Sequence, residues 1–453
     1  MSIGKQGESQ GTLWVAYDQI PKGQGHAFYD HLQRILRRGR FDSFAEELCA
    51  SFYAKSMGRP SIPPGRYFRM LLVGYFEGLD SERGICWRCA DSLSLREFLQ
   101  LELSESVPDH SSLSRIRRRL PLEAHHEIFV HVLGLLSHAG LLQGKRLGID
   151  ASTMEANAAM RSIVRHDTGE GYKAMLEQLA RESGIETPSL ADLVAFDRKR
   201  KNKHMSNKEW KSPIDADARI AKLKDGRTHL AHKAEHVVDL DSGAIVSARL
   251  HHADEGDTAT IHKTLKDTRS KLKSVKKKAA PRYDRPSELV ADKGYHSREV
   301  LKNLDSAFRS RISVPKTKGF SRWHGDHEAQ RAVYANRARV ASDKGKALLR
   351  KRGELVERSF AHCLDSGGMR RAYLRGTENI EKRYQIHVAA FNLGLLMRSL
   401  LGVGTPKGWS EAQFTLVLLH VGDQYFLLIL FYGSNNHEGT EFSGGFALSW
   451  SQN

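Results

Sequence analysis

Three acidic residues of this chain stand in sequence contexts typical of carboxylates that hold divalent metal ions. Asp150 follows the apolar run LGI, and Asp292 follows the apolar run LVA. Small or polar residues come next in both places and end a strand, so both carboxylates are predicted at strand C-termini. Glu357 lies in residues 346–362, where apolar residues recur at three- and four-residue steps without a proline, and this pattern predicts a helix.

These three carboxylates are candidate catalytic residues and candidate ligands for two Mg²⁺ or Mn²⁺ ions. Open α/β sheets gather ligands at the carboxyl ends of their strands, so two strand-end aspartates and a helix-borne glutamate can converge on one site. Oxygen donors suit these hard cations, whereas Zn²⁺ prefers His and Cys, which are not grouped at ligand spacing in this sequence. Two ions about 4 Å apart would activate a water or a 3′-hydroxyl on one side of a phosphodiester and stabilise the leaving oxygen on the other. For each acid alone the alternative is a solvated charge, since the chain has 53 Asp and Glu.

Four segments together resemble one protein family over roughly residues 41–404. The segment VPDHSSLSRIRRRL, at 107–120, is similar to an N-terminal signature of that family, and GIDAST and VADKGYHS are similar to the strands with its first and second aspartates. The segment GELVERSFAHCLDSGGMRRAYLRG is similar to the one with its catalytic glutamate. The family is the DDE transposases of bacterial insertion sequences with an InsH-like N-terminal region. The resemblance implies a ribonuclease H-like catalytic domain, Mg²⁺ dependence, and DNA strand cleavage and transfer at the inverted-repeat ends of the element.

The third acid has a rival in Glu354. Related families carry a Tyr-x-x-Arg-x-x-x-Glu signature around the last acid, and here no Tyr stands at the required place. Arg350 and Glu354 satisfy Arg-x-x-x-Glu, whereas Arg352 precedes Glu357 by one residue more than that pattern. The two glutamates point roughly 60° apart on a helix. Glu357 is favoured, because it lies on the apolar side of the helix and because VERSF matches the family best, and Arg350 and Arg352 become candidates for phosphate contact or solvated helix charges.

An excess of basic residues favours DNA as a partner. The chain has 70 Lys and Arg against 53 Asp and Glu, a formal net charge of +17 and a pI near 9.6. Two basic runs, 197–211 and 263–278, would neutralise several phosphates and make binding steeply salt-dependent, with a solvated loop or helix face as the alternative. The DNA-binding candidates from the first run and from the turn after the second aspartate are Lys199, Arg200, Lys201 and Lys293.

Helical periodicity dominates residues 26–140, which are predicted to form an N-terminal helical domain. Asp109 is the expected N-cap of a helix over 111–120 that carries Arg115, Arg117, Arg118 and Arg119. We interpret this helix as part of a helix-turn-helix-like reader that lies on DNA, with a helical scaffold for dimer contacts as the alternative. The domain's helices are expected at 26–36, 44–55, 64–78, 81–92, 95–101, 111–120 and 122–139.

The pattern changes at residue 145 to strands that alternate with helices, which predicts an α+β or α/β catalytic domain with a mixed sheet over 145–404. Residues 155–212 are expected to form a mostly helical, basic insertion after the first strand. A hairpin follows around the turn sequence Asp241-Ser242-Gly243. The remaining expected elements are helices at 258–273, 298–305 and 379–401, strands at 289–291 and 312–314, and a basic connector before the glutamate helix.

The two ends of the chain differ from the rest. Residues 1–25 are rich in Gly, Gln and Ser and are predicted to be loosely ordered, and residues 405–453 form an atypical tail. In that tail 414–431 is apolar but too short and too interrupted for a membrane span, so two strands, a packed helix and read-through sequence remain open. The N-terminus lacks an apolar signal core, and four Cys do not make a disulfide framework. We therefore expect a bacterial cytoplasmic, nucleoid-associated protein with no membrane partner.

The expected protein is a transposase that binds double-stranded DNA at terminal inverted repeats. It would nick the DNA with a metal-activated water and join the 3′-hydroxyl to target DNA. A homo-oligomer is expected from the resemblance, because two DNA ends have to be held together. Two alternatives remain, namely a catalytically decayed protein that binds inverted repeats without cutting and a ribonuclease H-like nuclease that acts on RNA.

Overall fold

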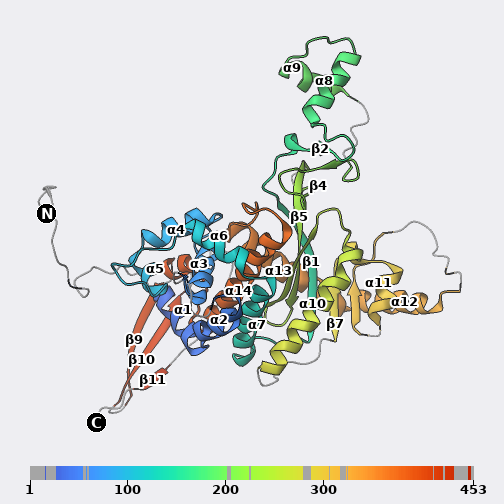
Figure 1. Ribbon diagram of the computed structural model, residues 1–453. Helices are drawn as coiled ribbons and strands as arrows, with labels where there is room; N and C mark the ends of the chain where they lie inside the picture. The colour runs from blue at the N-terminus through green and yellow to red at the C-terminus, as the bar shows by residue number, and fades with distance from the viewer. Residues whose placement is uncertain are drawn as a thin grey trace, which may run out of the picture.

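The computed structural model describes residues 16, 27–54, 58, 61–200, 206–223, 226–278, 287–305, 307–316, 323, 325–411, 413–421, 424–432 and 447–449. A helical region lies on one side of a mixed β-sheet, and a slender arm projects away from the sheet (Figure 1). The expected loose segment over 1–25 lies, except for Ala16, outside the described residues, and so does Lys201.

The N-terminal region is helical, as the periodicity predicts. Helix α3 begins with Pro64, which suits the first helical position, and α6 is capped by Asp109, whose side chain accepts a 2.7 Å hydrogen bond from the amide of Ser112. The expected helix over 44–55 starts earlier and ends in a 3₁₀ turn, η3. The elements are α1 (Ala27–Arg38), α2 (Phe41–Cys49), η3 (Ala50–Phe52), α3 (Pro64–Phe76), α4 (Glu82–Ala90), α5 (Leu93–Phe98), α6 (His110–Arg119) and α7 (Leu122–His138).

The sheet is mixed, which confirms the predicted fold class. Its strands lie in the order β4-β5-β1-β7-β8, and β6 also pairs with β5. Strand β7 pairs in parallel with β1 on one side and with β8 on the other. Strand β5 is antiparallel to β1, β4 and β6. The strand bounds are β1 (Arg146–Glu155), β4 (Arg219–Lys222), β5 (Thr228–Asp239), β6 (Ile245–His252), β7 (Glu288–Ala291) and β8 (Arg309–Ile312).

Asp150 does not end its strand, contrary to the prediction. Strand β1 continues to Glu155, because its antiparallel pairing with the long strand β5 runs through all of these residues. The parallel pairing with β7, in contrast, stops at Ile149 and Ala291. Asp150 therefore lies in mid-strand but at the point where one of its two neighbours leaves the sheet, and Asp292 follows β7 directly as predicted.

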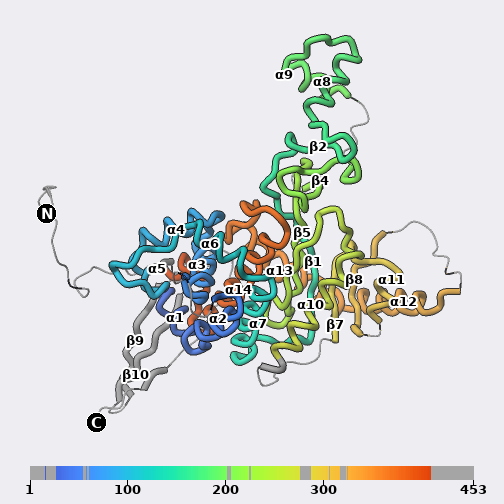
Figure 2. The backbone as a smooth tube through the Cα atoms, viewed as in Figure 1, coloured from blue at the N-terminus to red at the C-terminus, as the bar shows by residue number. Residues whose placement is uncertain are grey.

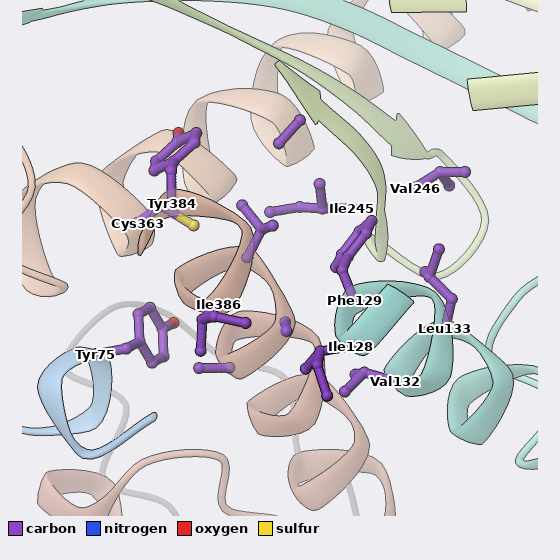
Figure 3. Close-up of a cluster of buried hydrophobic side chains, with 14 of the residues drawn as sticks. Tyr75, Ile128, Phe129, Val132, Leu133, Ile245, Val246, Cys363, Tyr384 and Ile386 are labelled. Carbon is purple, nitrogen blue, oxygen red and sulfur yellow. The ribbon is translucent and has the colours of Figure 1, made fainter. Parts of the chain in front are cut away.

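Helix α14 joins the helical region to the sheet. It is buried along most of its length and packs against α3, α7 and β6. Figure 3 shows the shared core, in which Phe129 of α7, Ile245 of β6 and Ile386 of α14 lie together. One continuous apolar core thus spans both parts of the chain. The helices of this part are α10 (Asp257–Lys278), α11 (Arg298–Asp305), α12 (His327–Ala341), α13 (Asp343–Phe360), a π-helical segment η6 (Ala361–Ser366) and α14 (Thr377–Leu401).

Helix α12 lies where the sequence predicts a basic connector before the glutamate helix. Its Asn336 side chain accepts a hydrogen bond from the amide of Ile312 at 2.9 Å and donates one to the carbonyl of the same residue at 2.8 Å. These two bonds satisfy the N–H and C=O groups of Ile312, which has no partner strand on that side because β8 is an edge strand of the described sheet. Such a tertiary contact leaves no local signal in the sequence.

The arm carries the insertion between β1 and β5 (Figures 1 and 2). It is less helical than predicted, because short strands form its base and helices form only its tip. The tip is not uniformly basic either, since Lys173 pairs with Glu177 at 3.4 Å on α8. Its elements are η4 (Met160–Ser162), β2 (Val164–Arg165), α8 (Tyr172–Glu182), α9 (Leu190–Lys199) and β3 (Trp210–Lys211).

The tail forms strands, which was one of the three alternatives. Helix α15 (Pro406–Glu411) precedes β9 (Gln413–Val421) and β10 (Gln424–Tyr432), which pair antiparallel, and β11 (Ala447–Ser449) pairs with β10. Among the described residues, one helical stretch, Thr377–Trp409, is long and apolar enough to cross a membrane. Within it, 61% of the most apolar window is buried inside the protein, which is typical of a core helix.

Candidate active site

The candidate active site begins with two aspartates on neighbouring parallel strands. Ile149 of β1 pairs with Ala291 of β7, and the next residue in each segment is an aspartate. Asp150 and Asp292 are therefore side by side where β7 ends. The carboxyl ends of parallel strands are the usual place for ligand-binding residues in such sheets.

Arg352 of α13 reaches both aspartates. Its Nη1 lies 2.5 Å from Oδ2 of Asp150, and its Nη2 lies 3.9 Å from Oδ1 of Asp292. The Arg352 side chain is only 11% exposed, whereas that of Asp292 is 45% exposed and opens the site to solvent. Arg352 was expected to contact DNA phosphate or solvent, but here its guanidinium is engaged by two carboxylates.

Gly148 allows α13 to lie this close to β1. A Cβ added at Gly148 would lie 2.7 Å from Cδ2 of Leu240, 2.9 Å from Cγ of Arg352 and 3.3 Å from Cγ2 of Val356. The alkyl stem of Arg352 thus passes directly over Gly148 on its way to the aspartates. Only a residue without a side chain fits between the strand and the helix at this point.

Arg352 does not fully compensate the negative charge of the two aspartates. Burial raises the pKa of Asp150 above its usual value, and the Asp292 carboxylate raises it further. The Arg352 guanidinium and the Ala151 amide lower the pKa without offsetting that rise. Two carboxylates that share one partly buried cation make a place where more positive charge is favourable.

Glu357 is exposed on α13, so the expectation that it faces inward is wrong for this structure. The buried face of the helix is formed by residues such as Val356 and Ser359. Arg352 occupies the helix position from which a side chain reaches the two aspartates, and Glu357 lies on the flank of that face. The sequence pattern missed this because an arginine with a long alkyl stem can fill an inward position as an apolar residue does.

Glu354, the rival acid, points further from the sheet than Glu357. At about 100° per residue, Glu354 lies roughly opposite the buried face of α13. Its carboxylate forms an exposed ion pair with Nη2 of Arg358 at 2.5 Å. Helix geometry therefore favours Glu357 as the acid nearer to the aspartates.

The aspartate pair has oxygen donors that suit a divalent metal ion. Within the described ranges, no group of three or more His, Cys, Asp or Glu side chains lies close enough to hold a metal. Asp150 and Asp292 lie side by side and provide two carboxylates without a third such ligand nearby in the described part of the chain. Mg²⁺ is commonly held by one or two carboxylates, with water and substrate phosphate as the other ligands, so this pair fits such an ion.

A buried network behind the site holds the turn that carries Asp292. Tyr295, in the 3₁₀ turn η5 (Lys293–Tyr295), donates a 2.7 Å hydrogen bond to Oε1 of Glu235 on β5. Glu235 is fully buried and also accepts hydrogen bonds from Thr260, at 2.8 Å, and from Thr264 of α10. Burial favours its neutral form, but hydrogen bonds from His251, Thr264 and Tyr295 outweigh that effect, and the pKa of Glu235 lies below its usual value.

This network was not predicted from the sequence. The available signal is an acid in the middle of strand β5, between Ala234 and His236, a position that requires partners once it is buried. A similar signal marks His236, which pairs across the strands with Asp150. The His236 ring stacks on Phe360 at 4.1 Å, and its Nδ1 lies 2.8 Å from Oγ of Ser359, so it holds the end of α13 against the sheet.

The four arginines of α6 separate into two kinds. Arg115 and Arg118 are exposed, and Arg119 is exposed while its guanidinium lies 4.9 Å from the ring centre of Tyr53. Arg117, in contrast, is buried and forms an ion pair with Glu82 of α4. The prediction that Arg117 contacts DNA is therefore wrong, because its charge is already used to hold α4 and α6 together.

The other DNA-binding candidates lie in two distant places. Lys293 and Arg350 are exposed near the aspartate pair, on η5 and α13. Lys199 is exposed at the end of α9 in the arm, and Arg200 next to it pairs with Asp197 at 3.4 Å. The structure thus does not bring the arm candidates to the aspartates (Figure 1).

Comparisons with known families agree with this architecture. Residues 15–119 match a transposase domain family, DUF772, and residues 191–393 match the transposase DDE domain family. No curated protein and no solved structure gives a match. The two family matches together cover more than half of the chain, and the second includes Asp292 and Glu357, while β1 with Asp150 lies between them. With its helical N-terminal region and its ribonuclease H-like mixed sheet, the chain belongs to the DDE transposases of insertion sequences.

Proposed function

We propose that this transposase cuts DNA at the ends of its insertion sequence and joins the freed 3′-ends to target DNA. Asp150, Asp292 and Glu357 are the proposed catalytic carboxylates. The observation that supports the proposal most strongly is the side-by-side position of Asp150 and Asp292 at the end of β7, with a cation drawn between them. Two carboxylates that lie side by side repel one another, so their position favours a bound cation.

The proposed chemistry needs metal at the aspartate pair. Asp150 and Asp292 would hold Mg²⁺ or Mn²⁺, and Glu357 would supply the third carboxylate for a pair of ions. When bound, such ions supply activation of a water or a 3′-hydroxyl and stabilisation of the leaving oxygen. Lys293, exposed beside Asp292, is positioned to contact the phosphate next to the cut bond.

The proposed DNA contacts extend beyond the aspartates. Arg115, Arg118 and Arg119 on α6 present positive charge at the surface of the helical region, and Arg350 does so on α13. The basic end of α9, with Lys199, gives the arm a means to reach DNA away from the cut site. Double-stranded DNA with terminal inverted repeats, target DNA and a second copy of the chain are the proposed partners, and the bacterial cytoplasm, at the nucleoid, is the proposed location.

The test is cleavage of a labelled duplex that carries the terminal repeats of the element, with Mg²⁺, with Ca²⁺ or without metal. We expect the wild type to cut with Mg²⁺ only, and Asp150→Asn, Asp292→Asn and Glu357→Gln to bind the ends without cutting. Glu354→Gln is the matched control, because it removes an acid from the same helix on the side away from the sheet. It should cut as the wild type does.

Three results would overturn the proposal. Equal cutting by Asp150→Asn would show that the aspartate pair is not the catalytic centre. Absence of cutting by a soluble wild type that still binds the ends would favour the alternative of a decayed end-binding protein. Preference for an RNA strand over duplex DNA would favour the ribonuclease H-like nuclease instead.

A further inference from the structure

The partners of Arg352 are the two carboxylates proposed to bind metal. In the part of the chain that the structure describes, its Nη atoms contact Asp150 at 2.5 Å and Asp292 at 3.9 Å, and its buried Nε has no hydrogen-bond partner. The contacts that hold the guanidinium are thus its hydrogen-bonded ion pair with Asp150 and its longer ion pair with Asp292. It stands where a divalent ion shared by the same two residues would stand.

The packing of the stem keeps the guanidinium at this place. The Arg352 stem lies over Gly148, next to Val356, so the start of the side chain is fixed while its charged end faces the open side of Asp292. Rotation about the outer bonds of the side chain moves the guanidinium without moving α13. The open side of the site, where the Asp292 side chain is 45% exposed, is the direction in which the guanidinium would move when the aspartates bind another cation.

We propose that Arg352 is an internal counter-cation, which has to leave the Asp150–Asp292 pair before a divalent ion binds there and which then pairs with a phosphate of the bound DNA. This inference rests on the proposed function. A guanidinium and a metal ion compete for the same carboxylate oxygens and repel one another, so both cannot occupy the pair at short range. The planar guanidinium also matches the geometry of a phosphate, which the cut site brings close.

One consequence is coupling between metal binding and DNA binding. Without DNA, the displaced guanidinium is left without a partner in a partly buried place, so metal binding is weakened. With DNA, a phosphate accepts the guanidinium, so each ligand strengthens the binding of the other by the same factor. The arginine would thereby restrict metal loading, and hence cutting, to protein that already holds DNA.

The experiment is a titration of the full chain with Mn²⁺, followed by electron paramagnetic resonance of the free ion, with and without a duplex that carries the terminal repeats. Arg352→Gln removes the charge, and Lys351→Gln is the matched control, because Lys351 is the exposed neighbour on the same helix. Without DNA, we expect Arg352→Gln to bind Mn²⁺ on the order of tenfold more tightly than the wild type, since one unit charge within about 4 Å has been removed. Lys351→Gln should bind as the wild type does.

The presence of DNA gives a second readout. DNA should tighten Mn²⁺ binding to the wild type more than binding to Arg352→Gln, which lacks the group that the phosphate accepts. Arg352→Met, which keeps an unbranched stem over Gly148, makes the same comparison if Arg352→Gln does not fold. A merely structural arginine would give weaker metal binding on removal, not tighter.

The outcomes separate this inference from the proposed function. Equal or weaker Mn²⁺ binding by folded Arg352→Gln and Arg352→Met, beside measurable binding by the wild type, would overturn the role of Arg352 and leave the metal site in place. Loss of Mn²⁺ binding in every variant, including the wild type with DNA, would overturn both. Tighter binding by Arg352→Gln would support the inference even if the duplex were not cut.

Discussion

The Tyr295 hydroxyl donates a hydrogen bond to the buried Glu235 carboxylate, and this contact fastens the turn that carries Asp292 to the central strand β5. Tyr295 lies three residues after Asp292, on the opposite side of the turn from the solvent. Burial and the Glu235 carboxylate both raise the pKa of Tyr295 well above its usual value, so the hydroxyl stays protonated and remains a donor. The position of one catalytic candidate thus depends on a residue that does not face the site.

Tyr295→Phe should therefore reduce stability. A hydrogen bond to a charged group contributes about 1.5–3 kcal/mol, and the expected loss in the free energy of unfolding lies in that range. Urea denaturation followed by circular dichroism measures it. Tyr334→Phe is the control, because Tyr334 is 50% exposed, and it should change stability little. Equal stability of Tyr295→Phe and the wild type would mean that the bond to Glu235 does not hold the turn.

Gly148→Ala should move α13 away from the sheet. The new Cβ would meet Leu240 and Arg352 at less than 3.0 Å, and overpacking of this kind costs about 1–3 kcal/mol. Thermal unfolding should show the loss of stability. The Mn²⁺ affinity should also change, because Arg352 is displaced from the aspartates. Gly134→Ala in α7 is the matched control, since a Cβ there meets nothing within 4 Å. That control should be neutral or slightly stabilising, because alanine favours a helix by about 1 kcal/mol over glycine.

Asp42→Asn should destabilise the helical region, because it leaves the buried charge of Arg69 without its partner. Arg69 is 1% exposed, and its Nε and Nη2 donate to the two Asp42 oxygens at 3.0 and 2.8 Å. The Asp42 side chain is 31% exposed and Arg69 keeps a hydrogen bond to the Phe98 carbonyl, so the expected loss is about 1–3 kcal/mol. Chemical denaturation at pH 7 measures the loss, and Asp30→Asn, at an exposed position of α1, should leave stability unchanged.

The same pair predicts the direction of a pH effect. Although burial alone would raise the pKa of Asp42, its hydrogen bonds and the charge of Arg69 lower the pKa below its usual value. The folded state therefore favours the ionised carboxylate, and the stability it contributes is present above the unfolded pKa and is lost as the pH falls through the folded pKa. Denaturation curves of the wild type should show this loss below about pH 4. Asp42→Asn should lose less stability over the same interval, and parallel pH profiles would contradict the assignment.

Arg117→Ala and Arg118→Ala should differ although the two residues are neighbours on α6. Arg117 is buried against Glu82, so its removal should cost about 3–5 kcal/mol of stability. Arg118 is exposed, so its removal should leave stability unchanged, weaken binding to the terminal repeats and lower the salt dependence of binding by about one phosphate contact. Unfolding curves and salt-dependent DNA titrations measure both. DNA binding by Arg118→Ala with an unchanged salt slope would remove α6 from the DNA-binding surface.

Elements with strong local signals were predicted closely. The helix over 298–305 and the strand over 289–291 agree with α11 and β7, and the cap of α6 at Asp109 is confirmed. Periodicity, caps and turn residues act within a few positions of the chain, so they can be read without knowledge of the rest of the molecule. The position of Asp292 directly after a strand belongs to this group.

Features that depend on distant segments were missed. The length of β1 past Asp150 depends on its pairing with β5, and α12 owes part of its place to the contact between Asn336 and β8. The burial of Arg117 depends on Glu82, which lies on another helix. A prediction from sequence considers each residue by its type and its near neighbours. Here contacts with distant segments determine the length of β1, the position of α12 and the burial of Arg117.

The sequence is enough to identify the carboxylates available for chemistry, after apolar runs and on a helix in a basic chain, and to predict a helical region and a mixed α/β region. These properties follow from residue types and local periodicity. Tertiary packing, in contrast, places Asp150 and Asp292 side by side, turns Arg352 and not Glu357 toward them, and anchors the turn behind them through Glu235. Strand register and the close approach of α13 over Gly148 arise from packing between segments that are far apart in the sequence, such as Asp150 and Arg352, which are 202 positions apart. Such packing leaves no periodic signal along the chain.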